Sequence, residues 1–209
     1  MRTNQELKNA ALAALKCKWT PAVLCALVYS AIVCVPTLLN ATESWVAMFI
    51  SYAFSICVAL PLGVGIYSAY RSLLVSGDAK VTENVVRDAF GNWGHNVAGM
   101  LLMTIYIVGW ALLLIVPGII KSLSYALTPF ILVDNPELSA DGAIVLSMKM
   151  MDGHKLDFFI LCLSFIGWGL LCILTLGIGF FWLIPYQYTT VAAFYEDVKA
   201  EYESRAVAA

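Results

Sequence analysis

Residues 107–120 read IVGWALLLIVPGII and residues 165–179 read FIGWGLLCILTLGIG, so one apolar pattern occurs twice in this chain. The shared Gly-Trp step stands at Gly109-Trp110 and again at Gly167-Trp168. A fixed period of this length indicates duplication of a whole supersecondary unit. Since both copies lie in long apolar runs, the pattern predicts a repeated membrane architecture and says little about chemistry.

Composition places the chain in a bilayer. Of its 209 residues, 61% are hydrophobic and 12% are charged, and the mean hydropathy is +0.84. Soluble domains carry about 45–50% apolar and about 25% charged residues. The net charge is −2 and no run of Lys or Arg occurs, so nucleic acid is not an expected partner. We therefore predict an all-α integral membrane protein.

The apolar segments are numerous enough for six transmembrane helices. They cover residues 19–39, 45–70, 97–116, 119–133, 158–174 and 177–195. A helix needs about 20 residues to cross the hydrocarbon core. The third and fourth meet at Pro117-Gly118, and the fifth and sixth at Thr175-Leu176-Gly177. Each junction is either a tight hairpin or a deep kink, and we favour the hairpin. The chain is then a single membrane domain, residues 1–209, with three hairpin units. The units are roughly residues 1–75, 76–133 and 134–200, with a short tail at 196–209.

The basic residues give the orientation. All but one of the 12 Lys and Arg residues, the exception being Lys121, fall on the same side of the proposed spans. The positive-inside bias makes that side cytoplasmic. Both termini are then cytoplasmic, as an even number of spans requires. Each hairpin leaves the cytoplasm and returns to it, so the internal repeat is parallel.

Short amphipathic helices are expected on the cytoplasmic side. Thr3 and Glu6 form a capping box ahead of apolar residues at helical spacing. A second pattern follows Lys80, with Thr82 as its cap, and a third follows Ser139. We expect these three helices to lie in the membrane interface.

Several motifs of the second half resemble a known family. They are VPGIIKSLSY at residues 116–125, DNP at 134–136, MDGHK at 151–155, WLIPY at 182–186 and FYED at 194–197. Together they resemble the bacterial integral membrane proteins grouped as domain of unknown function 975. The resemblance implies a multi-pass protein of the bacterial cytoplasmic (inner) membrane, and it implies no activity.

Two histidines stand at matching points of the repeat, His95 after Gly94 and His154 after Gly153. They are either a pair that binds an anionic headgroup or senses pH, or joints where a helix ends at the membrane surface. The repeat favours joints. Lys121 lies in a proposed span, where a charge is costly. It either pairs with Glu43 of the first outer loop or extends to the outer surface.

Other polar positions have similar alternatives. Asp134 and Asn135, ahead of Pro136, form either a ligand patch or a helix stop, and we favour the stop. Tyr125 joins the residues that a transport cleft would use. That cleft would be lined by Ser122, Ser124, Tyr125, Thr128 and Tyr186.

The sequence predicts a non-enzymatic role. It has no nucleophile and base constellation, so we assign no catalytic residue, cofactor or metal. We expect a membrane module that binds or organises lipids, anionic lipids in particular, or partner membrane proteins, a second copy included. A collar of basic residues, Lys80, Arg87, Lys149 and Lys155, would meet anionic headgroups. The alternative is a small-solute or lipid transporter.

Overall fold

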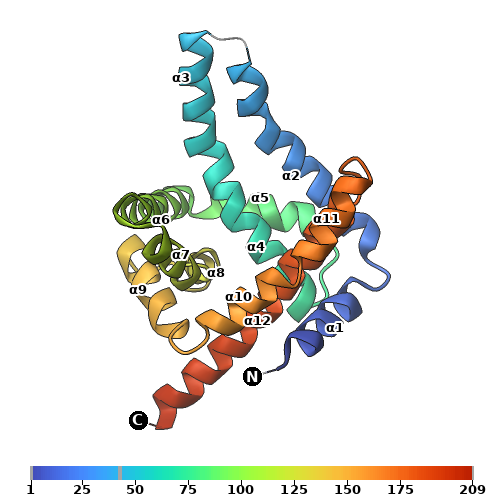
Figure 1. Ribbon diagram of the computed structural model, residues 1–209, viewed down its shortest axis with the longest axis vertical. Helices are drawn as coiled ribbons and strands as arrows, with labels where there is room; N and C mark the ends of the chain where they lie inside the picture. Colours follow the sequence, from blue (N-terminus) through green and yellow to red (C-terminus); the bar gives the residue numbers. More distant parts are fainter. Residues whose placement is uncertain (1, 42–43, 209) are drawn as a thin grey trace.

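The computed structural model describes residues 2–41 and 44–208, and these residues are helical almost throughout (Figure 1). The helices are α1 (Asn4–Leu15), α2 (Trp19–Asn40), α3 (Trp45–Phe54), η1 (Ser55–Ala59), α4 (Leu60–Val75), α5 (Val81–Gly91), α6 (Trp93–Leu113), α7 (Ile115–Ser124), α8 (Thr128–Asp134), α9 (Ala140–Met150), α10 (Lys155–Leu163), α11 (Ile166–Leu174) and α12 (Phe180–Ala208). The all-α prediction is confirmed.

Five helical stretches of the described chain are long and apolar enough to cross a membrane. They are Trp19–Asn40, Trp45–Val75, Trp93–Leu113, Ile115–Asp134 and Lys155–Leu174. The predicted sixth segment, residues 177–195, opens the long helix α12 and is not among them. The reason is chemical, because α12 has five consecutive polar residues from Tyr186 to Thr190 in its first half.

The first capping prediction is confirmed and the second is wrong. The hydroxyl of Thr3 accepts from the backbone N–H of Glu6, whose carboxylate accepts from the N–H of Thr3, so α1 begins with a complete capping box. The start of α5 is instead organised by Asp78, whose carboxylate accepts from the N–H of Lys80 at 2.9 Å. Thr82 lies inside α5 and does not cap it.

The stretch from α3 to α4 is one continuous helix with a π-helical segment, η1, in its middle. Pro61 causes it, since proline has no N–H for the carbonyl four residues earlier and its ring crowds that carbonyl. The freed carbonyl is that of Cys57, and the indole N–H of Trp93 donates to it at 2.8 Å. This bond fixes the start of α6 against the middle of the long helix.

The chain between α6 and α7 turns at Leu114, whose backbone is extended (φ −158°, ψ 137°). Pro117 and Gly118 lie within the first turn of α7, so the turn comes three residues earlier than predicted. The two helices cross closely at Gly118, where a Cβ would stand 2.8 Å from Cα of Ala111. The ammonium of Lys121 lies 5.0 Å from the ring centroid of Trp110, so α7 runs back along α6.

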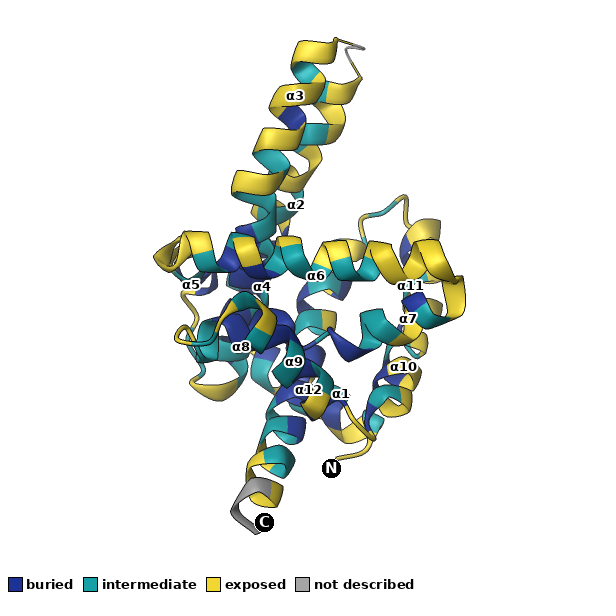
Figure 2. Cartoon of the chain, turned by 90° about the vertical axis from the view of Figure 1, so that its left-hand side faces the viewer, coloured by how far each residue is buried: buried dark blue, intermediate teal, exposed yellow. Residues whose placement is uncertain are grey.

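The apolar helices project in different directions from a common centre. Helices α2 and α3 extend together to one end of the molecule, and α6 lies across their direction (Figure 2). Their outer halves are exposed, whereas the centre, formed by α4, α8 and the middle of α12, is buried. We call this centre the hub.

The three short amphipathic helices bury their apolar faces in the protein. Helix α1 packs Leu7, Ala11 and Leu15 inward, all three fully buried. Helix α5 does the same with Val81, Val85 and Ala89, and α9 with Ala143, Ile144 and Met150. Their hydrophobic stripes are therefore core contacts, and only scattered apolar side chains, such as Val86, remain exposed on the outside.

Candidate functional site

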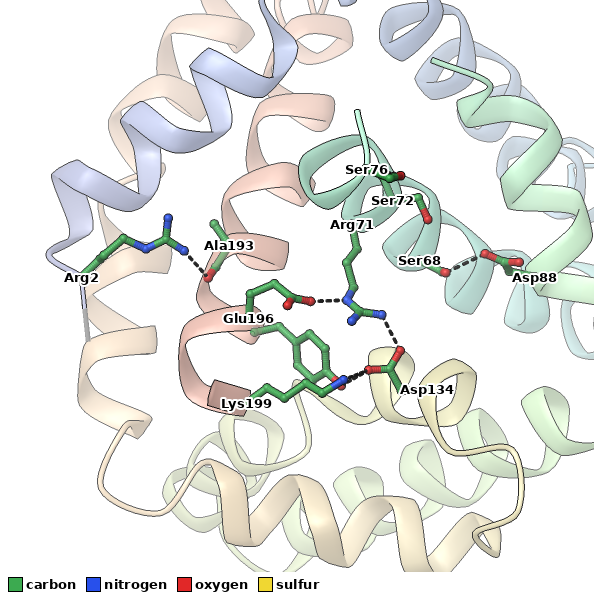
Figure 3. A network of polar contacts seen from close by, with 11 residues as sticks. Arg2, Ser68, Arg71, Ser72, Ser76, Asp88, Asp134, Ala193, Glu196 and Lys199 are labelled. Carbon is green, nitrogen blue, oxygen red and sulfur yellow. Dashed lines mark hydrogen bonds and ion pairs between the residues drawn. The ribbon is translucent and has the colours of Figure 1, made fainter. Parts of the chain in front are cut away.

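The densest polar cluster of the described chain joins three elements of the hub. Arg71 of α4 donates to Glu196 of α12 and to Asp134 at the end of α8 (Figure 3). Asp134 also accepts from the ammonium of Lys199 at 2.6 Å and from the hydroxyl of Tyr195 at 2.7 Å. We call these five residues the ion network.

Packing fixes the network as well as charge does. The ring of Tyr195 stacks on Phe130 of α8 with centroids 4.6 Å apart, and the guanidinium carbon of Arg71 lies 5.1 Å from the centroid of Tyr195. The side chains of Arg71 and Asp134 are only 20% and 12% exposed. The network contains two cations and two carboxylates, so its charge is balanced. Such a closed arrangement holds helices together and leaves no free nucleophile or base.

Local sequence explains why Asp134 stands at this point. Helix α8 has seven residues and carries Pro129 in its first turn. It ends at Asp134 because Asn135 is its C-cap and Pro136 cannot continue the helix. The predicted helix stop is confirmed for Asn135, whose carbonyl accepts from the N–H of Leu138 at 3.1 Å. For Asp134 that reading is incomplete, since its carboxylate is the centre of the ion network.

A second ion pair ties the N-terminus to α12. The backbone N–H of Arg2 donates to Asp197 at 2.9 Å, and the guanidinium Nε donates to the same carboxylate at 2.8 Å. The guanidinium also reaches the carbonyl of Ala193 (Figure 3). Burial alone would raise the pKa of Asp197, but the bonds from Arg2 outweigh it and hold that pKa below its ordinary value.

This pair predicts a pH dependence of α1 docking. A carboxylate with a lowered folded-state pKa contributes stability that is present above its unfolded pKa, about 3.9, and is lost as the pH falls through the lower folded value. We expect amide hydrogen exchange in α1 to be unchanged between pH 7 and 5 and to rise below pH 4, after correction for intrinsic exchange. In Asp197→Asn the acid-induced step should be smaller but not absent, because the hydrogen bonds from Thr3 also hold the pKa of Glu6, in the capping box of α1, below its ordinary value. An equal step in both proteins would contradict the assignment.

The two histidines occupy different environments. His95 lies inside the first turn of α6, and its Nε2 has no hydrogen-bond partner among the described residues. His154 precedes α10 and is buried, with Nε2 3.5 Å from Glu201 and Nδ1 3.9 Å from Asp157. Gly153 has the left-handed φ of +86° that ends a helix. The predicted joint therefore fits His154, and it is wrong for His95, which lies within α6.

Lys121 contacts aromatic rings and α9. Its ammonium lies between Trp110 and Tyr125, 5.0 and 6.0 Å from their centroids, and 3.8 Å from the sulfur of Met148. The proposed partner Glu43 lies outside the described residues. Helix α9 thus runs beside α6 and α7, where the hydroxyl of Tyr106 also donates to Asp141 at 3.0 Å.

The basic collar is only partly free. Lys80 lies 3.6 Å from Glu83, and Arg87 lies 2.9 Å from Asp88. Lys149 and Lys155 have no carboxylate partner among the described residues, and Lys149 is exposed. Within this collar the positive charges without a carboxylate partner are therefore those of Lys149 and Lys155.

Two cavities bear on the predicted transport cleft. One, of about 380 Å³, lies between the start of α2 and the turn from α11 to α12, and is almost wholly apolar. The other, of about 320 Å³, lies under α6 and α7 and includes Ser122, Tyr125 and Gln187. The predicted cleft is thus partly wrong. Tyr186 lines the first cavity, while Ser124 and Thr128 are buried and line neither of the two.

Sequence reasoning missed most of the ion network. Arg71 and Lys199 were used only among the basic residues that orient the spans. Tyr195 and Glu196 were used only as parts of the FYED motif of the family resemblance. The available signal was position, because Arg71, Asp134 and Glu196 all end apolar segments on the same predicted side. No group of three His, Cys, Asp or Glu within the described residues is placed to hold a metal ion.

Of three comparisons with known proteins, one found a match. No curated protein and no solved structure matches the chain. A family model described as "Protein of unknown function (DUF975)" matches residues 54–202. This range includes all five residues of the ion network. With well over half of its length matched, the chain belongs to the DUF975 family.

Proposed function

We propose that this protein is a non-enzymatic, multi-pass membrane module that binds or organises lipids or partner membrane proteins. One observation carries the proposal. Its apolar helices stay exposed around a folded hub, and in the most apolar window of Trp93–Leu113 only 11% of the residues are buried. In water such surfaces would be an aggregation hazard, whereas in a bilayer they face acyl chains.

The arrangement that we propose has six spans in three hairpins, with both termini in the cytoplasm of a bacterial inner membrane, and it requires α6 to turn from its direction across α2 and α3 into theirs. Contacts between successive helices support it. The hydroxyl of Ser51 donates to the carbonyl of Pro36 at 3.1 Å, Gly118 packs on Ala111, and Gly179 packs on Cys172. Helix α12 would be the sixth span, carrying its polar residues against the hub. In this arrangement the parallel internal repeat corresponds to the close contacts between successive helices, one in each hairpin.

Anionic lipid is the partner that the free charges favour. Each basic residue near an anionic surface contributes about 1 kcal/mol, or roughly fivefold in affinity. Since Glu83 and Asp88 already pair with Lys80 and Arg87, these two should contribute less than Lys149 and Lys155.

The test is native mass spectrometry of the full-length protein in detergent, titrated with phosphatidylglycerol or phosphatidylcholine of equal chain length. We expect retained phospholipid and a preference for the anionic lipid. Replacing Lys149 and Lys155 by Gln should weaken that preference several-fold, and the matched replacement of Lys80 and Arg87 should weaken it less. A protein that retains no phospholipid and shows no headgroup preference would refute lipid binding as the function.

A transporter is the second candidate, favoured by the 320 Å³ cavity. The hydroxyls of Ser122 and Tyr125 and the amide of Gln187 supply polar groups in an otherwise apolar lining. A transport path requires that this cavity open to both sides in turn. Flux of small solutes into proteoliposomes that is lost in Gln187→Leu would support transport over the lipid module.

A further inference from the structure

The apolar cavity has a shape and position suited to a lipid chain. It is lined by Leu12 of α1, Trp19 at the start of α2, Trp168 and Leu171 of α11, and Trp182 and Tyr186 of α12. Its volume of about 380 Å³ falls within the range of on the order of 300–1,000 Å³ for ligand sites. Trp168 and Trp182 are both about half exposed, so the cavity opens on the outer surface of the helices.

A lysine stands at one end of this cavity. Lys8 lies one helical turn before Leu12 on the same face of α1. Its ammonium is 4.7 Å from the ring centroid of Phe165 and 3.5 Å from the carbonyl oxygen of Ser164. The ring of Phe165 in turn packs edge-on against Tyr186, with centroids 5.4 Å apart. The charge therefore lies at the α10–α11 joint, separated from the cavity wall at Tyr186 by the ring of Phe165.

Lys8 lacks a counter-charge. No carboxylate of the described residues pairs with it, in contrast to Arg2, Arg71 and Lys199, which all have one. Partial burial lowers the pKa of Lys8 from its usual value, because the ammonium has lost some of its water. An anion bound here would restore the missing partner.

Two more cations stand at the joint between α1 and α2, just before Trp19 of the cavity lining. Lys16 and Lys18 stand on either side of Cys17, whose left-handed φ of +66° turns the chain into Trp19. Neither has a carboxylate partner among the described residues. The Lys18 ammonium lies against Gly77 in the loop after α4, 2.9 Å from where a Cβ of that glycine would stand, so it is not part of the cavity wall. The far end of the cavity, at Thr175 and Gly179, is the turn between two apolar helices.

We propose that this cavity binds one acyl chain of an anionic phospholipid, with the headgroup phosphate paired to Lys8. The chain lies along α11 from Trp168 toward Thr175, and the headgroup lies at the α10–α11 joint, where Lys8 stands. The site rests on the proposed lipid-binding function and gives it a location distinct from the collar. Apolar contact supplies most of the affinity, and Lys8 supplies the preference for an anion.

The experiment measures binding of the first lipid to the full-length protein by native mass spectrometry, with dioleoyl phosphatidylglycerol and dioleoyl phosphatidylcholine as probes. Lys8→Gln should lose about fivefold in affinity for phosphatidylglycerol and leave phosphatidylcholine unchanged. Leu171→Trp, which fills the cavity, should weaken both lipids. The matched control is Leu170→Trp, since Leu170 is 60% exposed and does not line the cavity.

A second measurement does not depend on the variants. Brominated acyl chains quench tryptophan at contact, so brominated phosphatidylglycerol should quench the wild-type protein more than brominated phosphatidylcholine at equal mole fraction.

Wild-type affinity in both Lys8→Gln and Leu171→Trp would overturn the site. If in that case the Lys149 and Lys155 replacements still remove the anionic preference, the lipid-binding function holds and only its location at Lys8 is wrong.

Discussion

Replacing Arg71 with methionine is expected to lower the thermal unfolding midpoint in detergent by roughly 5–15 °C. The reason is that Glu196 loses its guanidinium partner and Asp134 loses one of three. Breaking a buried ion pair on one side costs about 3–5 kcal/mol. We expect about 2–4 kcal/mol here, because the Glu196 side chain is 29% exposed and keeps some access to water.

The matched control is Arg205→Met, which removes the same group from an ion pair in which the arginine is 60% exposed and its partner Glu201 is 29% exposed, as Glu196 is. An exposed pair contributes about 0–1 kcal/mol, so this midpoint should barely move. The double variant Arg71→Met, Glu196→Met should recover part of the loss, since no carboxylate is then left without its partner. Equal midpoints for Arg71→Met and Arg205→Met would show that the ion network does not hold the hub.

Replacing Gly65 with alanine should be the second severe change. A Cβ at Gly65 would overlap the backbone carbonyl oxygen of Val85 and would stand 3.0 Å from Cβ of Ala89, so α5 would have to move away from α4. Overpacking of this kind costs about 1–3 kcal/mol, and the higher end applies because a backbone atom cannot rotate aside. The thermal midpoint should fall by several degrees.

Gly63→Ala supplies the control on the same helix. Its Cβ would meet only the flexible end of Met100, at 3.8 Å. Alanine is favoured over glycine inside a helix by about 0.5–1 kcal/mol, so this variant should be neutral or slightly more stable. The account therefore predicts opposite signs two residues apart, and a similar loss at both positions would refute the close packing of α4 on α5.

Local features of the fold could be predicted from the sequence because their causes are local. The apolar run from Trp19 predicted a helix that the structure gives as Trp19–Asn40, and Ser139 caps α9 through the N–H of Gly142 as its position implied. The turn before α7 was misplaced because Pro117 was taken for the end of a helix. Proline is equally at home in the first turn of one, where its missing N–H costs nothing.

Long-range features could not be predicted in the same way. The ion network joins residues separated by 63 and 125 positions, and nothing in a single sequence pairs Arg71 with Asp134 or Glu196. Charges at the ends of apolar segments were used to orient the spans and not to connect them. The apolar faces of α1, α5 and α9 were likewise assigned to the membrane, because a periodic stripe does not reveal whether lipid or protein covers it.

The central claim is that the α2–α3 hairpin crosses the membrane outward from the hub, while α5 and the end of α12 stay in the cytoplasm. Membrane-impermeant thiol labelling of single cysteines, placed in a cysteine-free background, tests it most directly. We expect a cysteine at Ala41, where α2 ends, to be labelled from outside intact cells. Cysteines at Gly91 and Ser204 should be labelled only after the cells are opened. Ala41 labelled only in opened cells would contradict the claim, since the α2–α3 hairpin would then not reach the far side.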